Sequence, residues 1–396
     1  MKHFPRTGLA KALADSLQGL ALFGDDHNGL FLAAPRRTGK SSFLQSDLMP
    51  ELAKRGVVVV YVDLWSDKER DPAALIAEAV GNVFAENLGI VAKAAKYSGL
   101  AEVSLGGWLK VDTTKIGKPD GMTLPSVLKE LAAMTKKQIA VIVDEAQHAL
   151  TSRQGESAMA ALKAARDTMN IGGVVQLMVV MSGSDRDKLL RLVNTNGAAF
   201  FGSEIRKMPL LGKDFVDHAQ AQLEAAYPEL KPIDSLVLTE SFQLFGERPQ
   251  FFSRAVGNAL NPLGDWPKEQ RFEERVLALA RKKLTEDEAG MASEFVSLKP
   301  LEQVVLWRIL DKGPDFKPYD ADALAFYVDK LGKKVTQPSV QLAIDGLRAR
   351  DPSLIWKSAR GEYAVDDAMM HVWFDSLSNA GKWPPQKPAT VDIWSD

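Results

Sequence analysis

The sequence of 396 residues contains no cysteine and only five histidines, which are scattered along the chain. Without cysteine there can be no disulfide bond, no thiolate catalysis and no zinc site with cysteine ligands, and the absence fits a reducing compartment. The scattered histidines argue against a metal site built from imidazoles. These two shortages favour a protein of the cytosol.

Long apolar runs and a dominant charge are also missing. No apolar stretch approaches the roughly 18 residues that a membrane helix needs, and the N-terminal sequence MKHFPRTGLAKAL lacks the apolar centre of a signal peptide. The 49 basic and 51 acidic residues give a net charge of -2, so no general positive field attracts nucleic acid. We therefore expect a cytoplasmic protein without a membrane partner, in which any contact with DNA is local.

The most informative motif is GLFLAAPRRTGKSSFL at residues 29–44, where an apolar run leads into a turn and a predicted helix start. In a phosphate-binding loop, backbone N–H groups and a helix N-terminus point at the phosphates, a lysine neutralises phosphate charge, and a hydroxyl ligates Mg²⁺. Lys40 and Ser41 fit the last two roles, and Gly39 lets the backbone approach closely. We predict that ATP and Mg²⁺ bind through a loop formed by Ala34, Pro35, Arg36, Arg37, Thr38, Gly39, Lys40, Ser41 and Ser42.

This loop departs from the motif G-x-x-x-x-G-K-[ST] at one place, because Ala34 stands where the first glycine belongs. With glycine at about 7% of residues, a bare G-K-[ST] arises by chance in roughly one chain in five of this length. The loop alone is therefore a weak signal, and it needs a second motif to support it.

The second motif is QIAVIVDEAQHAL at residues 138–150, a β-branched run that ends in Asp144 and Glu145. Such a run is typical of a buried parallel strand. An acid at the carboxyl end of a strand beside the loop strand can hold the Mg²⁺ shell, and a second acid can polarise the attacking water. Asp144 is the predicted Mg²⁺ ligand, with Ser41, and Glu145 is the predicted base. The alternative is a strand followed by a charged helix cap.

Strands alternate with helices through the first half of the chain, which predicts a doubly wound parallel sheet. The loop strand is followed by predicted strands at 56–65, 138–144, 174–181 and 205–211. Residues 101–121 alternate around paired glycines and predict an inserted hairpin. We therefore assign residues 1–211 to an α/β P-loop core, in which the ligand lies at the carboxyl ends of the strands.

Further polar residues follow the later strands of this core. Ser182 and Ser184 are placed to touch the terminal phosphate or to orient water, although a serine and glycine turn with Asp185 as a helix cap explains them equally well. Transition-state charge needs a cation, and Arg186, Arg191 and Arg206 are candidates to reach the nucleotide of a neighbouring subunit. That role requires a homo-oligomer, and the alternative is a solvated surface arginine. We choose Arg206.

Strands disappear after residue 211, and amphipathic segments at 212–295 predict a helical lid domain. Within it the sequence Gly246-Glu247-Arg248-Pro249 breaks one helix and begins another, with proline near the first turn. Arg248 is a candidate sensor of the terminal phosphate, and a surface salt bridge is its alternative.

Residues 296–378 predict three helices and a hairpin, the order of elements in a winged helix. In a DNA reader the third helix enters the major groove. Acids balance bases in this segment, and Asp345 lies on the third helix, so protein docking stays open as the alternative. Residues 379–396 predict a flexible end or a peptide docking arm. The candidates for contact with duplex DNA are Gln337, Ser339, Gln341, Arg348, Lys357 and Arg360.

Over residues 3–377 the chain resembles the archaeal-type ATPases related to the STAND and origin-recognition AAA+ groups. The resemblance rests on APRRTGKSS, AVIVDEAQ, AAFFGSEIRKMPLLGKDF, GERP and EYAVDDAMMHVWF, in this order and spacing. It implies an ASCE P-loop ATPase core of the AAA type, a helical lid and a C-terminal winged helix. Family members usually have glycine at Ala34 and often arginine at Ser203. The second difference puts an arginine acting in trans, and with it the oligomeric mechanism, in doubt.

Two functions fit these observations. In the first, the protein binds and hydrolyses ATP as a switch that controls DNA engagement or recruitment of a partner protein, as in DNA transactions, mobile elements or phage defence. In the second, it binds nucleotide as a slow or non-hydrolysing signalling scaffold and uses the winged helix to dock a protein. The combination of Lys40, Ser41, Asp144 and Glu145 favours the first.

Overall fold

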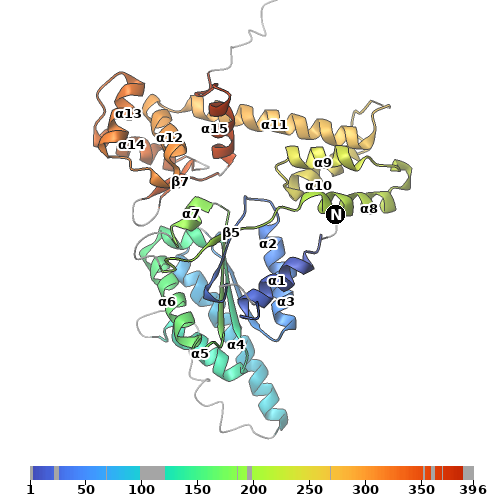
Figure 1. Ribbon diagram of the computed structural model, residues 1–396, viewed down its shortest axis with the longest axis vertical. Helices are drawn as coiled ribbons and strands as arrows, with labels where there is room; N and C mark the ends of the chain where they lie inside the picture. The colour runs from blue at the N-terminus through green and yellow to red at the C-terminus, as the bar shows by residue number, and fades with distance from the viewer. Residues whose placement is uncertain are drawn as a thin grey trace, which may run out of the picture. The chain divides into compact units, whose positions relative to one another are not determined.

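The protein is described by a computed structural model that covers two compact units, His3–Pro209 and the residues from Leu210 onward (Figure 1). Each unit is considered by itself. The predicted hairpin insertion at 101–121 lies outside the described residues except for its last residue. The structure describes residues 3–21, 26–67, 69–98, 121–184, 186–193, 199–267, 269–350, 353–357, 362–367 and 369–386.

The first unit is built on a sheet of five parallel strands in the order β2-β3-β4-β1-β5. The predicted doubly wound parallel sheet is confirmed. One detail of the prediction is wrong: the strand that carries Asp144 does not lie beside the loop strand, because β4 is inserted between them. The strands are β1 (Leu30–Ala33), β2 (Val58–Asp63), β3 (Ile139–Asp144), β4 (Leu177–Gly183) and β5 (Ile205–Lys207).

The strand register brings the chemically important residues to one edge of the sheet. Asp63 at the end of β2 pairs with Asp144 at the end of β3. Ala33 at the end of β1 pairs with Gly183 at the end of β4. Because parallel strands share their direction, the carboxyl ends of these four strands lie together.

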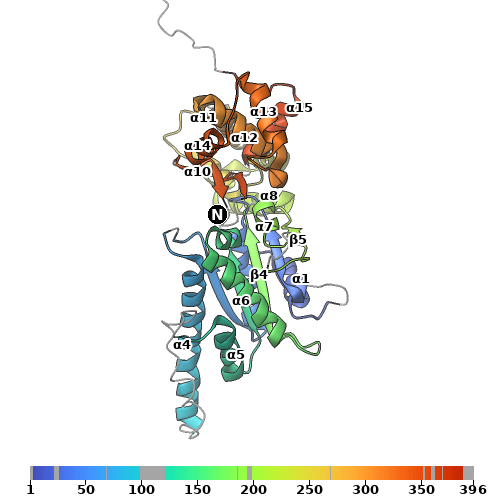
Figure 2. The ribbon, with the colours of Figure 1, turned by 90° about the vertical axis from the view of Figure 1, so that its left-hand side faces the viewer.

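Helices cover both faces of this sheet, with α1 and α3 on one side and α5 and α6 on the other (Figures 1 and 2). On the first face, leucines of α1 and of the continuous helical run 40–54 pack against buried residues of β1, β3 and β4. This burial holds the run that follows the phosphate loop against the sheet. The helices are α1 (Thr7–Leu17), α2 (Lys40–Phe43), a π-helical turn (Leu44–Leu48), α3 (Met49–Lys54), α4 (Pro72–Ser98), α5 (Leu124–Thr135), α6 (Arg153–Met169) and α7 (Arg186–Leu190).

Helix α4 contains a longer apolar stretch than the sequence analysis predicted. Its segment Pro72–Ile90 is long and apolar enough to cross a membrane by length and composition, and 28% of the tested window is buried. The expectation that no stretch approaches this length is therefore wrong. The reason is its alanine-rich composition, in which Glu78 and Glu86 are the charged residues. A single helix of this kind is weak evidence of a membrane span, since a helix that covers a sheet meets the same criteria.

The second unit begins with a helical region whose core is aromatic. Rings of Phe215, Phe242 and Phe252 meet with centroid distances between 4.8 and 6.0 Å, a range in which aromatic pairs stabilise each other. The predicted boundary near residue 295 falls in the last turn of a long helix. The elements are α8 (Gly212–Ala226), α9 (Ser235–Leu244), α10 (Pro249–Ala259) and α11 (Phe272–Ser297).

The chain closes in a winged helix, as predicted. Strands β6 (Ile355–Lys357) and β7 (Tyr363–Val365) form an antiparallel pair after the third helix. Leu306, Tyr327 and Ile344 from the three helices meet in one core. The helices are α12 (Pro300–Lys312), α13 (Ala321–Leu331), α14 (Gln337–Arg348) and α15 (Met369–Asn379).

The prediction of a flexible tail at 379–396 is wrong for the first residues of that segment. Helix α15 continues to Asn379, and Trp383 beyond it packs on the winged-helix core. The indole ring of Trp383 makes edge-on contacts with Phe295, Trp373 and Phe374 at centroid distances of 4.8, 5.3 and 4.7 Å. One large ring provides enough apolar surface to fix this stretch despite the two prolines that follow it.

Candidate nucleotide-binding site

The loop between β1 and α2 has the backbone that a phosphate-binding loop needs. Gly39 adopts a left-handed conformation with a φ of 90°, and Arg37 adopts one with a φ of 68°. The hydroxyl of Thr38 donates to the carbonyl of Pro35 at 2.7 Å and closes the turn. Helix α2 begins directly after this turn, and the first N–H groups of a helix have no acceptor within it. Those N–H groups are the donors that a phosphate requires.

The backbone conformation of Ala34 shows why the loop needs no glycine at its first position. Its N–H donates to the carbonyl of Gly183 at 3.1 Å, so the residue extends β1 along β4. Ala34 is not among the residues with left-handed backbone, and an alanine is therefore accommodated without strain.

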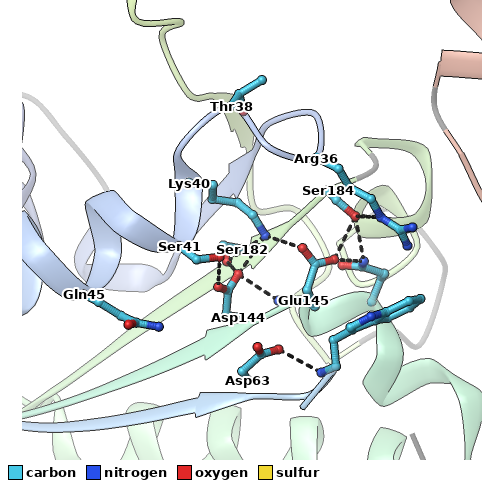
Figure 3. A network of polar contacts seen from close by, with 12 residues as sticks. Arg36, Thr38, Lys40, Ser41, Gln45, Asp63, Asp144, Glu145, Ser182 and Ser184 are labelled. Atoms are coloured by element: carbon cyan, nitrogen blue, oxygen red, sulfur yellow. Dashed lines mark hydrogen bonds and ion pairs between the residues drawn. The ribbon is translucent and has the colours of Figure 1, made fainter. Parts of the chain in front are cut away.

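Lys40 lies at the centre of a buried charged cluster (Figure 3). Its Nζ is 2.7 Å from Oδ1 of Asp144 and 2.7 Å from Oε1 of Glu145. The hydroxyl of Ser41 donates to the other oxygen of Asp144, Oδ2, at 2.6 Å. The structure thus brings together the four residues that the sequence predicts for phosphate binding, Mg²⁺ ligation and water activation.

Asp144 has two further donors. The hydroxyl of Ser182 donates to Oδ1 of Asp144, so this serine belongs to the cluster. Tyr61 on β2 donates its hydroxyl proton to Oδ2 at 3.1 Å, and the side-chain amide of Gln45 donates to Tyr61 at 2.8 Å. Sequence reasoning missed Tyr61 and Gln45, although a tyrosine within an otherwise aliphatic buried strand is a signal that its hydroxyl has a specific partner.

Glu145 is held by both of its oxygens. Lys40 binds Oε1, while Oε2 accepts hydrogen bonds from Ser184 at 2.8 Å and from the side-chain amide of Gln147 at 2.6 Å. Its backbone is left-handed, with a φ of 53°, which is uncommon for a residue other than glycine. This conformation turns the carboxylate of Glu145 toward the loop at the point where β3 ends. Gln147 is a third residue that sequence reasoning missed.

The electrostatics of the cluster favour ionised acids. Burial alone would raise the pKa of Asp144, but the charge of Lys40 and the hydrogen bonds to the carboxylate lower that pKa below its ordinary value. The same balance, again with Lys40 as the main opposing cause, lowers the pKa of Glu145. Burial raises the pKa of the neighbouring Asp63, and the charges of Asp144 and Glu145 raise it further. Two carboxylates are therefore kept charged at neutral pH.

The donor set fits Mg²⁺ and a nucleotide. A hydroxyl oxygen of Ser41 and a carboxylate oxygen of Asp144 are hard ligands of the kind that Mg²⁺ prefers, and Mg²⁺ usually takes its remaining ligands from water and substrate phosphates. Among the residues that the structure describes, no group of three or more histidines, cysteines or acids is placed to hold a metal alone. The site is thus suited to a metal that arrives with phosphate.

The predicted arginines lie apart from this cluster or cannot be placed against it. Arg206 on β5 forms an ion pair with the buried Asp26 at 2.9 Å. Its guanidinium therefore binds a residue of the segment that precedes β1. The side chain of Arg186 lies outside the described residues. Arg248 directly precedes α10 in the other unit, and its guanidinium lies 5.5 Å from the ring centre of Phe251. The predicted roles of Arg206 and Arg248 toward nucleotide stay predictions.

Several DNA-contact candidates have partners within the winged helix. Asp345 accepts a hydrogen bond from Gln341 at 2.9 Å and lies 3.8 Å from the guanidinium of Arg348. Ser339 takes part in the cap of α14. The ammonium group of Lys357 lies 5.4 Å from the ring centre of Tyr363. Gln337 is exposed at the first turn of α14, and Arg360 lies outside the described residues.

Comparison of the sequence with protein-family models and with curated proteins gives no match. Among solved structures, the Walker-type ATPase of Pyrococcus abyssi is similar, with 16% identity, 94% of this chain and 96% of that chain covered, and a TM-score of 0.50. The ORC2 protein of Aeropyrum pernix in its ADP form is 14% identical, with 95% of this chain and 93% of that chain covered and a TM-score of 0.48. Identity at this level establishes the fold and not the activity. The chain has the fold of the Walker-type ATPase of Pyrococcus abyssi, with its parallel sheet in the order described above.

Proposed function

We propose that the protein is an ATP-binding and ATP-hydrolysing molecular switch, whose nucleotide state controls DNA engagement or the recruitment of a partner protein. One observation carries this proposal: Lys40, Ser41, Asp144 and Glu145 converge in a single cluster at the end of a phosphate-binding loop, with Lys40 and Asp144 buried at its centre. The similar structure from Pyrococcus abyssi is described as a Walker-type ATPase, which supports ATP as the nucleotide.

Each residue of the cluster has a role in this proposal. Lys40 binds the terminal phosphates of the nucleotide, together with the N–H groups of the loop. Ser41 and Asp144 would hold Mg²⁺, which would neutralise phosphate charge. Glu145, kept ionised by its surroundings, accepts the proton of the attacking water. Ser184 and Gln147 orient the Glu145 carboxylate through its second oxygen.

A second candidate function is a slow or non-hydrolysing signalling scaffold that docks a protein through the winged helix. Asp345 favours it, because this acid binds Gln341 and lies beside Arg348 on the helix that would read DNA. An acid on that face repels the phosphate backbone.

Turnover measurements separate the two candidates. We expect the wild-type protein to hydrolyse ATP, and duplex DNA to stimulate it. Glu145→Gln should bind ATP with similar affinity but lose turnover by about 10²–10⁴-fold, the usual contribution of a positioned base. This variant also serves to subtract contaminating activity. Turnover at the wild-type level in Glu145→Gln would remove Glu145 as the base, and wild-type turnover that is absent or indifferent to DNA would favour protein docking.

A further inference from the structure

Tyr61 stands among valines in β2, and its hydroxyl lies beside the predicted Mg²⁺ ligand. In the register of the sheet Tyr61 pairs with Ile142, two residues before Asp144. Two residues along a strand span roughly 7 Å, which the long side chain of a tyrosine can bridge. Its hydroxyl donates to Oδ2 of Asp144 at 3.1 Å, and its ring packs against the apolar core shared by the sheet and α1. The packed ring therefore fixes the place from which the hydroxyl donates.

Gln45 sets the direction of this hydrogen bond. It lies four residues after Ser41 on the helical run that follows the loop (Figure 3). Its side-chain amide donates to the hydroxyl oxygen of Tyr61 at 2.8 Å. A tyrosine hydroxyl carries one proton, and an amide N–H can only donate. Because its oxygen already accepts from Gln45, Tyr61 gives its own proton to Asp144.

Asp144 is held from both neighbouring strands. Strand β3, which carries Asp144, lies between β2 and β4 in the sheet. From β4 the hydroxyl of Ser182 donates to Oδ1, and from β2 the hydroxyl of Tyr61 donates to Oδ2. Donors on the two oxygens fix the plane of the carboxylate. In the proposed function Lys40 binds phosphate and Ser41 ligates Mg²⁺. Tyr61 has neither role and stays a donor to Asp144.

We infer that Tyr61 is a positioning residue that fixes the Asp144 carboxylate for Mg²⁺, and that Gln45 acts through Tyr61. This inference rests on the proposed function, because it takes Asp144 as a Mg²⁺ ligand. Mg²⁺ demands nearly ideal octahedral geometry, so a misaligned carboxylate binds it poorly. Groups that orient a metal ligand contribute about 10–100-fold to metal affinity.

The first test measures Mg²⁺ binding without turnover. Calorimetric titration of ADP in EDTA, and over a series of Mg²⁺ concentrations, gives the Mg²⁺ affinity of the nucleotide-loaded site. We expect Tyr61→Phe, which loses only the hydroxyl, to need about 10–100-fold more Mg²⁺ than the wild type for the same gain in ADP affinity. In EDTA both proteins should bind ADP equally. Tyr227→Phe, at an exposed tyrosine directly after α8, is the matched control and should behave like the wild type.

Steady-state kinetics separate positioning from a general loss of structure. ATP turnover by Tyr61→Phe should be low at limiting Mg²⁺ and should approach the wild-type kcat at saturating Mg²⁺. A defect of folding would not be rescued by the metal. If the wild type binds nucleotide but does not hydrolyse ATP, the proposed hydrolysis fails, and the calorimetric comparison still decides the role of Tyr61.

A double-mutant cycle tests the role of Gln45. Gln45→Met removes the amide donor and adds no charge. It should lower Mg²⁺ affinity in the wild type by less than Tyr61→Phe does. In the Tyr61→Phe background it should have no further effect, because Gln45 acts only through the lost hydroxyl. Gln243→Met, at an exposed glutamine of α9, is the control.

Three results would overturn the inference. The first is an unchanged Mg²⁺ requirement in Tyr61→Phe. The second is an equal loss of ADP affinity with and without Mg²⁺ in that variant, which would give Tyr61 only a role in the shape of the site. The third is a wild type whose ADP affinity does not depend on Mg²⁺. Additive losses in the cycle would overturn the part assigned to Gln45. A wild type that binds no ADP at all would instead remove the proposed nucleotide site, and the inference with it.

Discussion

At the scale of single residues, Asp144 accepts hydrogen bonds from a lysine, two serines and a tyrosine, which reach it from two neighbouring strands and the loop helix. Each donor favours the ionised carboxylate. Lys40 matters most, because it also compensates Glu145. Removal of Lys40 would leave the buried carboxylate of Asp144 and the partly buried one of Glu145 without their cation, which is far more costly than the loss of one hydrogen bond.

This dependence predicts a pH-sensitive stability. In the wild type, the lowered pKa values of Asp144 and Glu145 contribute stability above the ordinary carboxyl range, and that contribution disappears as pH falls through the folded-state pKa values. In Lys40→Ala, burial should raise both pKa values instead. At pH 7.5 without nucleotide, we expect the free energy of unfolding of Lys40→Ala to be about 3 kcal/mol below that of the wild type. This difference should become smaller toward pH 5.

Urea unfolding at the two pH values measures this effect. Lys54→Ala, on the exposed side of α3, is the control that removes a lysine without touching the cluster. A deficit of Lys40→Ala that is the same at pH 5 and pH 7.5 would contradict the electrostatic account of the cluster.

At the scale of elements, the sequence predicts most of the fold because the apolar periodicities are strong. The helix start predicted after the loop is found at Lys40, and the three helices and hairpin predicted over 296–378 occur in that order. The insertion of β4 between β1 and β3 was not predictable from local pattern, because strand order is set by how crossover helices pack. Tyr61 and Gln147 were missed for a related reason: their partners come from distant segments.

Trp383 packs on the winged-helix core although it lies beyond the end of α15. We expect Trp383→Ala to destabilise the second unit by about 2–4 kcal/mol, toward the low end of the range for large aromatic truncations because the ring is partly buried. Leu263→Ala, at a side chain that is 91% exposed, should change stability by less than about 0.5 kcal/mol. An unchanged urea midpoint in Trp383→Ala would mean that residues 380–386 do not pack on the winged helix.

At the scale of the whole molecule, the proposed switch requires the nucleotide site in the first unit to influence the winged helix in the second. The charge of the winged helix gives no strong field for DNA, and Asp345 neutralises part of the positive charge of α14, the helix proposed to contact DNA. The proposed binding of duplex DNA therefore has to depend on a few cations, and each phosphate contact would contribute a definite share of the salt dependence.

Charge changes on α14 and β6 test this contact. We expect Arg348→Ala combined with Lys357→Ala to weaken DNA binding and to reduce the salt slope by about 2, one for each lost phosphate contact. Asp345→Asn should strengthen binding, because it removes the repelling acid. Lys282→Ala, an exposed lysine on α11, is the control. Unchanged affinity and slope in all of these variants would favour a docked protein over DNA.

The central claim is that the loop and its cluster form an ATP site, and calorimetry of ATP with Mg²⁺ tests it most directly. We predict that the wild type binds one ATP per chain and that Lys40→Ala has no measurable affinity, because it lacks the charge that holds the phosphates. Lys54→Ala should bind like the wild type. Equal ATP affinity in wild type and Lys40→Ala would contradict the phosphate-loop assignment and every role derived from it.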